Sequence, residues 1–336
     1  MSEALGTLDA PVLVLADLDG TRPTDPALEL VAAARTLTGG DGDVVALTLG
    51  PVEAEASAAL AAAGANRLLV ADLGGERAQA AAGADAVVAA VHEVAPGAVL
   101  VSSDYRGKET AGRAAVLLDS ACVSDVADLR VVDGALHADR LVLSGSWSTT
   151  MSANAHTVHP PILAVRPGSV EVPDASVDDA APLPAVALEA AVSPEAAAVR
   201  LVSRESTAAA AGPDLAGART VVVGGRGVDG DFDLVRSLAE PLGAAVGATR
   251  VACDEEWIER SAQIGQTGVS IAPRLYIGLG VSGAIHHTSG IQGAGTIVAV
   301  CDDSEAPIFE MADFGVVGDV TEVVPQLVAE LDRLRG

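Results

Sequence analysis

The chain has 336 residues, half of them apolar, and its 20 basic and 46 acidic residues give a formal net charge of −26. This length favours two domains with large buried cores, and the charge argues against nucleic acid or an anionic membrane surface as a partner. Aromatic residues make up only 2% of the chain, so a site for a flat ligand must use backbone groups, hydroxyls and charges.

The first half alternates short apolar runs with alanine-rich helical segments. Strands are expected at 11–17, 43–49, 67–72 and 97–103, and helices at about 26–37, 53–63, 78–94 and from near residue 107. Apolar strands separated by helices indicate a parallel sheet covered on both faces. The segments 128–145 and 160–168 have the pattern of hairpin or edge strands.

From residue 167 to 213 the composition shifts to Pro, Ala, Asp and Glu, with one strand-like run at 198–206. This favours a linker or crossover. The alternation then restarts, with strands expected at 219–225, 243–250, 275–280, 296–300 and 314–318, and helices at about 232–242, after Gly283 and from about Val320. We therefore predict an α/β fold of two doubly wound parallel-sheet domains, 1–166 and 214–336, the second being the smaller.

Two long stretches, 141–165 and 275–301, contain no Asp, Glu, Lys or Arg. Both are interrupted by polar residues and glycines that a membrane span would bury at great cost, so they favour a buried ligand site over membrane insertion. Cys122, Cys253 and Cys301 are widely separated, which argues against a disulfide framework and favours a reducing cytoplasm. The N-terminal residues lack the basic region of a signal peptide, and no residue spacing indicates a metal site.

In parallel α/β sheets the ligand lies beyond the carboxyl ends of the strands, so the residues after each strand of the second half are candidates. Gly224–Gly227 is a flexible turn that carries Arg226. Thr249 and Arg250 close an apolar strand, where a guanidinium can neutralise an anion. An ordinary tight turn and a surface arginine are equally good interpretations of these two features.

The segment 263–268 is a glycine-containing loop with amide and hydroxyl groups that can donate and accept hydrogen bonds. The spacing of Gly278, Gly280 and Gly283 matches a dinucleotide-binding turn, and Asp302 with Asp303 follow about 20 residues later. Such matches also arise by chance in a chain with 35 glycines. Alone, this motif would favour a nicotinamide-dependent dehydrogenase domain. No hydrolase signature is evident.

Six motifs of the second half, in order and spacing, resemble the α subunit of the electron transfer flavoproteins. They are GGRG, AAVGATR, QIGQTG, PRLYIGLGVSGAIHHTSG, TIVAV and EAPIFEMADFGVVGD. The first half is similar to the N-terminal domain of that family more loosely, through VLVLAD, SDYRGKETAGRAA and SDV. The resemblance implies that 214–336 is an FAD-binding domain.

The resemblance also implies a function without substrate turnover of its own. Such a subunit forms an obligate heterodimer with a β subunit, which holds AMP or a second FAD. It carries electrons from dehydrogenases, such as the acyl-CoA dehydrogenases of fatty-acid β-oxidation, to a membrane quinone oxidoreductase. Whether the complex performs simple transfer or bifurcation is left open. A redox-silent nucleotide-binding subunit is the remaining alternative.

Carried over by residue, the resemblance implies three redox-tuning groups: Arg250 against the flavin ring, the Thr267 hydroxyl near N5 and His287 near the O2 carbonyl. The full set of implied cofactor contacts is Arg226, Thr249, Arg250, Ile264, Gly265, Gln266, Thr267, Ser282, Gly283, Ala284, Ile285, His286, His287, Cys301 and Asp319. A cation near N1 and O2 would stabilise the negative charge that reduction places there.

Four positions depart from the family pattern. Thr249 stands where Ser is common, and His286 where Gln is common, which adds a titratable group. Cys301 replaces an Asn that helps to hold the adenosine part, and Asp302 replaces a Lys. Because a thiol is a weak donor, the adenosine contacts are expected to weaken or to pass to Asp302 or the backbone.

Overall fold

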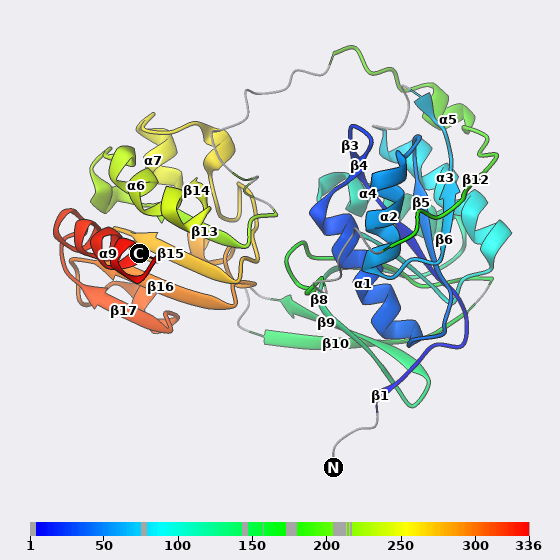
Figure 1. The fold of residues 1–336 in the computed structure, drawn as a ribbon, viewed down its shortest axis with the longest axis horizontal. Coiled ribbons are helices and arrows are strands. Elements are labelled where there is room, and N and C mark those ends of the chain that lie inside the picture. Colours follow the sequence, from blue (N-terminus) through cyan, green and yellow to red (C-terminus); the bar gives the residue numbers. More distant parts are fainter. Residues whose placement is uncertain are drawn as a thin grey trace. The chain divides into compact units, whose positions relative to one another are not determined.

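The computed structural model describes residues 5–74, 79–142, 147–156, 158–172, 180–203, 213, 215 and 217–335. Its chain separates into two compact units, one formed by the described residues up to 203 and one by those from 213 onward. Each is an α/β unit with its own sheet (Figure 1). The predicted fold class is therefore confirmed.

The sheet of the first unit has the strand order β10-β9-β8-β11-β7-β2-β5-β6-β12, with β1 also paired to β8. Its strands are β1 (Leu5–Gly6), β2 (Val12–Leu15), β5 (Val44–Thr48), β6 (Arg67–Val70), β7 (Ala98–Ser102), β8 (Cys122–Val132), β9 (Ala135–Val142), β10 (Trp147–Asn154), β11 (Ile162–Val165) and β12 (Ala185–Ala187). The pairs from β11 through β12 are parallel, whereas β8, β9 and β10 form an antiparallel extension.

Helices cover both faces of this parallel part. They are α1 (Asp25–Thr38) and α2 (Ala54–Ala63) on one face, and α3 (Ala80–Val94) and α4 (Tyr105–Leu117) on the other. The strands β2, β5 and β7 are buried along their whole length, which explains why they read as continuous apolar runs in the sequence. A small hairpin of β3 (Leu18–Asp19) and β4 (Arg22–Pro23) lies between β2 and α1.

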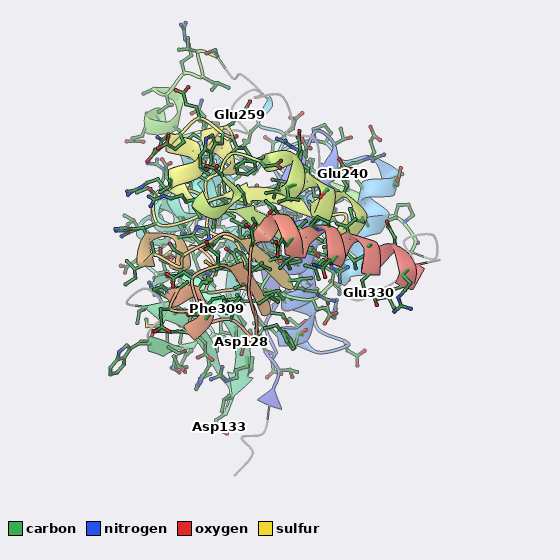
Figure 2. The ribbon with its side chains drawn as sticks, turned by 90° about the vertical axis from the view of Figure 1, so that its left-hand side faces the viewer. Asp128, Asp133, Glu240, Glu259, Phe309 and Glu330 are labelled. Atoms are coloured by element: carbon green, nitrogen blue, oxygen red, sulfur yellow. The ribbon has the colours of Figure 1, made fainter. Side chains whose placement is uncertain are left out.

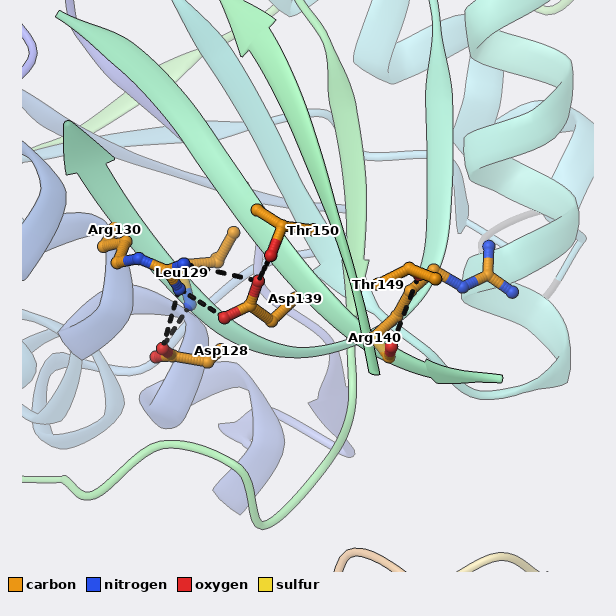
Figure 3. Close-up of polar contacts among 7 residues, drawn as sticks. All are labelled: Asp128, Leu129, Arg130, Asp139, Arg140, Thr149 and Thr150. Carbon is orange, nitrogen blue, oxygen red and sulfur yellow. Dashed lines mark hydrogen bonds and ion pairs between the residues drawn. The ribbon is translucent and has the colours of Figure 1, made fainter. Parts of the chain in front are cut away.

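The antiparallel extension carries a polar network on its surface (Figure 3). Arg130 on β8 pairs with Asp128 and with Asp139 on β9, and the Thr150 hydroxyl of β10 also donates to Asp139. The Arg130 bond is the main cause that holds the pKa of the Asp139 carboxyl below its usual range. The network links three neighbouring strands through side chains in addition to their backbone ladders.

The strand expected at 198–206 is not found in the described residues of that segment. Residues 198–203 contain no strand, and 204–206 lie outside the described residues. The strand of this region is β12, which pairs in parallel with β6, and the short helix α5 (Pro194–Ala197) follows it. Ser193 caps α5 and its backbone N–H donates to Asp85 of α3 at 2.8 Å. The segment 180–203 therefore belongs to the first unit.

Within its described residues, the second unit has five parallel strands in the order β14-β13-β15-β16-β17. They are β13 (Thr220–Gly224), β14 (Ala245–Ala248), β15 (Leu275–Leu279), β16 (Thr296–Cys301) and β17 (Phe314–Val317). Helices α6 (Phe232–Leu242), α7 (Arg250–Asp254) and α9 (Val320–Arg335) cover one face. Glu240 and Glu330, labelled in Figure 2, lie on α6 and α9.

The other face of this sheet is covered mostly by irregular chain. Ile264, Ile271, Val281 and Ile308 pack there against the strands, with α8 (Ile285–Thr288) and the 3-10 turn η5 (Pro307–Glu310). Two further 3-10 turns are η3 (Arg226–Val228) and η4 (Arg260–Ala262). Within the described residues, no helix has the length and apolar character needed to cross a membrane.

Candidate functional site

The strand order of the second unit defines where a ligand crevice is expected. Counted in chain order, the strands lie as 2-1-3-4-5. The chain first runs from β13 to β14 on one side and then crosses to β15 on the other side. The strand order therefore reverses between β13 and β15. Ligands of such sheets bind outside the carboxyl ends of the strands at this switch point. The turns that follow are Gly225–Gly227 after β13 and Gly280–Gly283 after β15.

The backbones of these two turns are in direct contact. The Gly227 N–H donates to the Gly280 carbonyl at 3.0 Å, and the Gly225 N–H to the Leu279 carbonyl at 2.8 Å. A Cβ at Gly225 would lie 2.2 Å from the Gly280 oxygen, and Gly280 has a φ of +61°. Only glycine fits this approach and this conformation, so the switch point is lined by main chain.

The helical turns that start here have no side-chain caps. Among the described residues, no side chain accepts a hydrogen bond at the start of η3, of α7 or of α8, whose N-cap residues are Gly225, Thr249 and Ala284. The first N–H groups of a helix have no partner within it. In η3 the Gly227 N–H already donates to the Gly280 carbonyl, so the starts of α7 and α8, together with the two arginines, are the groups suited to a phosphate-bearing ligand.

The arginines proposed from the sequence lie at this edge. Arg226 is exposed in η3, and Arg250 is exposed as the first residue of α7. The expected strand 243–250 is therefore wrong at its end, because Thr249 and Arg250 begin a helix that the sequence did not predict. Arg250 Nε lies 3.8 Å from Asp254 Oδ2, so its guanidinium lies along α7 toward the last residue of that helix.

The loop 263–268 is tied to the strand end on one side and to α8 on the other. Ile264 N–H donates to the Ala248 carbonyl at 2.9 Å, and Gln266 N–H to the His286 carbonyl at 2.7 Å. Gly265 has a φ of +140°, and a Cβ on it would meet the same His286 carbonyl. Ile264 and Gly265 are buried, whereas Gln266 and Thr267 are exposed.

The proposed residues on α8 and just before it differ in their solvent exposure. Ser282, Ala284, Ile285 and His286 are exposed, and Gly283 and His287 are buried. His286 Nδ1 lies 2.8 Å from Gln266 Oε1, so these two proposed residues contact one another. The apolar Ile285 side chain is 67% exposed.

His287 is held by the protein at both ring nitrogens. Its Nδ1 lies 3.1 Å from the Ile264 carbonyl, and its Nε2 lies 2.8 Å from the hydroxyl of Tyr276, which is fully buried. Because the carbonyl only accepts, Nδ1 carries the proton and Nε2 accepts from Tyr276. Burial lowers the pKa of His287 to about 4, so this imidazole is neutral at neutral pH.

The last two proposed residues lie at the ends of β16 and β17, Cys301 as the last residue of β16 and Asp319 two residues after β17. Cys301 is buried, its carbonyl accepts from Gly318 N–H at 2.9 Å, and its Sγ lies 3.8 Å from Asp302 Oδ1. Asp319 accepts from the hydroxyl and the N–H of Thr321 at 2.7 and 2.8 Å at the start of α9, and these bonds lower the pKa of its carboxyl. Asp319 is therefore already hydrogen-bonded within the chain.

All proposed residues thus lie at the carboxyl ends of the five strands or on the loop between β14 and β15. Sequence reasoning missed Asp254, Arg260, Gln263 and Tyr276, which hold the proposed residues in place. Gln263 lay inside a loop already noticed, and its 2% exposure distinguishes it. Among the described residues, no group of His, Cys, Asp and Glu side chains could hold a metal ion.

Comparison with known proteins gives a consistent result over both units. Residues 12–193 match the family model of the electron transfer flavoprotein domain, and residues 214–292 match that of the electron transfer flavoprotein FAD-binding domain. Electron transfer flavoprotein subunit alpha of Mycobacterium leprae is 39% identical over 313 residues, which cover 92% of this chain and 94% of the relative. The same subunit of Mycobacterium tuberculosis is 38% identical, covering 97% and 100%, and that of Bacillus subtilis is 34% identical, covering 96% and 98%.

Proposed function

The chain belongs to the electron transfer flavoprotein family as an α subunit, and we propose that it carries electrons in a complex with a β subunit, with FAD at the carboxyl edge of the second sheet. The observation that carries the proposal is the contact of two glycine turns at the switch point, flanked by uncapped helical turns and by Arg226 and Arg250. The match to the family's FAD-binding domain, 214–292, includes both glycine turns, which favours FAD over a nicotinamide cofactor.

The described residues fit a dinucleotide. The main-chain turn at Ser282–Ile285 and the Arg226 guanidinium would hold the diphosphate, since uncapped N–H groups and a cation both favour an anion. The segment that begins with Cys301, the last residue of the next strand β16, would hold the adenosine part. Thr249, Arg250, Gln266 and Thr267 would surround the flavin ring. When bound, FAD supplies the capacity to take up and release electrons.

The positive charge beside the ring would come from Arg250. The loop and strand residues 261–301 contain one formally charged residue, Arg274, and His287 is neutral at neutral pH because of its burial. For His287 to reach the flavin O2 with a ring nitrogen, it would have to exchange its bond with Tyr276 or Ile264. We therefore assign the main electrostatic role to Arg250, with His287 supporting the loop beside it.

The family resemblance supports the proposed electron donors, electron acceptor and partner subunit. The proposed donors are dehydrogenases such as acyl-CoA dehydrogenases in fatty-acid β-oxidation, and the proposed acceptor is a membrane quinone oxidoreductase. The β subunit would form an obligate heterodimer with this chain and would carry AMP or a second FAD. We keep 214–336 as the proposed second domain and extend the proposed first domain from 1–166 through residue 203, because β12 and α5 of the predicted linker 167–213 pack on it. All three cysteines are free thiols, which is consistent with the cytoplasm as the proposed location.

The test is co-expression with the β subunit encoded by the same source. A yellow complex with FAD bound is expected, and a complex that neither contains nor takes up FAD would contradict the proposal. In the Arg250→Ala variant, the potential of the first one-electron reduction should fall, because a cation beside the ring stabilises added negative charge. Arg236→Ala on α6 removes the same charge from an exposed i,i+3 ion pair and should leave that potential unchanged.

A further inference from the structure

A chain of side-chain hydrogen bonds runs from α7 to the loop of the site. Arg260 Nη2 donates to Asp254 Oδ1 at 2.6 Å, and Arg260 Nη1 donates to Gln263 Oε1 at 3.3 Å. Gln263 Nε2 then donates to Thr267 Oγ1 at 3.0 Å. Asp254, Arg260 and Gln263 belong to none of the contacts expected from the family resemblance.

The direction of each bond in this chain follows from the chemistry of Arg260. A guanidinium has five N–H donors and no acceptor, so the group of Gln263 that faces it must be the carbonyl oxygen Oε1. The amide nitrogen then points the other way, toward Thr267. Gln263 is only 2% exposed, so water cannot readily replace either partner, and reversing the amide would place two donors against each other.

The consequence for Thr267 is a defined hydrogen-bonding role. Its oxygen accepts from the Gln263 amide, so its hydroxyl proton is not used in that bond and can be donated elsewhere. The Thr267 side chain is exposed at the carboxyl edge, and in the described part of the chain no acceptor within hydrogen-bond distance takes that proton. The Gln263 bond occupies one lone pair of the oxygen and so favours donation of the proton over a second accepted bond.

We propose that Gln263, oriented by Arg260, is a positioning residue that makes the Thr267 hydroxyl a hydrogen-bond donor toward the flavin ring. This inference rests on the proposed function. The oxidised ring presents nitrogen N5 and oxygen O4 as acceptors along one edge, so a hydroxyl already favoured as a donor stabilises the bound cofactor with little reorientation when it binds. Asp254 contributes by holding Arg260, and it also lies beside Arg250.

The experiment is a double-mutant cycle in the FAD-containing complex. Gln263→Glu keeps the size of the side chain but replaces the amide donor by a carboxylate oxygen, which would accept from Arg260 and from the Thr267 hydroxyl. Thr267→Val removes that hydroxyl at nearly constant shape. The readouts are the NMR chemical shift of isotope-enriched N5 in bound FAD and the potential of the first reduction. Comparing Thr267→Val in both backgrounds cancels the direct effect of the added charge.

In the native background, Thr267→Val should move both readouts. In the Gln263→Glu background its effect should be at least about twofold smaller, because the hydroxyl already points to the carboxylate. Equal effects in both backgrounds, or no effect of Thr267→Val in the native protein, would overturn the inference. Absence of FAD from the native complex would instead count against the proposed function.

If the Gln263→Glu variant does not assemble with FAD, a second variant tests the same inference. Arg260→Ala removes the group that orients the amide, so the Thr267→Val effect should again shrink, while FAD still binds. Arg236→Ala, an exposed arginine of α6, is the matched control and should leave the Thr267→Val effect at its native size. An unchanged effect in Arg260→Ala would show that Arg260 does not orient Gln263.

Discussion

The carboxyl edges of the two sheets differ in how their polar groups are satisfied. In the first unit the parallel strands lie in the order β6-β5-β2-β7-β11, so the order reverses between β2 and β7. Asp17 follows β2 and pairs with Arg106 at the start of α4. Lys108 Nζ lies 2.7 Å from Asp125 Oδ1, and Asp104 caps α4 by accepting from Gly107 N–H at 2.7 Å.

At the switch point of the second unit, glycine turns stand where the first unit has charged pairs, and the ion pairs of the second edge lie beside it, at α7. The turns after β13 and β15 begin with Gly225 and Gly280, and no described side chain caps η3 or α8. In the first unit, by contrast, both helices that start at the switch point are capped, α1 by Thr24 and α4 by Asp104. Strand order therefore determines where a ligand crevice is expected. The local side chains determine whether the polar groups at that point already have partners within the protein.

The largest expected effect tests the glycine contact of the second edge. A Cβ at Gly280 would lie 2.5 Å from the Gly227 Cα, and Gly280 has a φ of +61°. We expect Gly280→Ala to lower the free energy of unfolding by several kcal/mol, about 1–2 from the left-handed conformation and ~1–3 from the backbone clash. Bound FAD should be lost as well, as measured by flavin absorbance per complex alongside urea unfolding.

The control for this substitution is Gly243→Ala. Gly243 also has a positive φ, +59°, but a Cβ there meets nothing within 4 Å. Only the conformational cost of about 1–2 kcal/mol is expected, with FAD retained. If the two variants were equally stable and both kept FAD, the contact between the glycine turns would have no special role at this edge.

The next effect concerns the neutral His287 beneath the same edge. Burial lowers its pKa to about 4, from an ordinary value of 6.5, so between these pH values the unfolded chain binds a proton that the folded protein does not. Stability therefore falls as the pH drops from about 6.5 toward 4, by up to ~3 kcal/mol from this residue. Urea unfolding of the complex at several pH values measures this loss.

His287→Asn should remove this part of the pH dependence. It should also lower the stability near neutral pH by about 1–3 kcal/mol, because the buried Tyr276 hydroxyl or the Ile264 carbonyl loses its partner. A variant that kept the full slope of the native protein between pH 4 and 6.5 would show that another group causes it. The second edge would then no longer be distinguished by a buried, uncharged histidine packed beneath its glycine turns.

Much of this architecture could be predicted from the sequence, and the failures have identifiable causes. The expected helix 232–242 and the strands near 275–280, 296–300 and 314–318 are confirmed within one or two residues, because apolar periodicity is a local signal. The strand β10 was missed because its alternation is of Ser and Thr with few apolar residues. Thr249 and Arg250 were placed on a strand because α7 is only five residues long.

The candidate site shows the same division between local and long-range information. Glycine turns and their arginines could be located from motifs, but Gln263 and Tyr276 are recognised only through partners that lie several residues or a whole element away. Burial also changed the expected charge of His287 from a candidate cation to a neutral group. Hydrogen-bond direction and desolvation depend on the packed structure, which a single sequence does not display.

The smallest expected effect tests the first edge, where the charges satisfy one another. Arg106→Met removes the cation beside Asp17, whose side chain is 12% exposed and whose pKa is raised by burial and lowered by Arg106. We expect a loss of about 1–3 kcal/mol at neutral pH, because a largely buried carboxylate loses its partner. FAD content should stay at the native level, in contrast to Gly280→Ala.

The pH dependence of this variant distinguishes an unpaired charge from lost packing. Without Arg106, the folded pKa of Asp17 should rise further above its unfolded value, so the folded protein binds a proton more readily than the unfolded chain. Stability relative to the native protein should therefore recover as the pH falls from 7 to 5. The double variant Asp17→Asn/Arg106→Met has no carboxylate and should be more stable than Arg106→Met at pH 7, without this recovery. A single variant that lost FAD together with stability would show that the first edge also supports the cofactor, and the contrast between the two edges would fail.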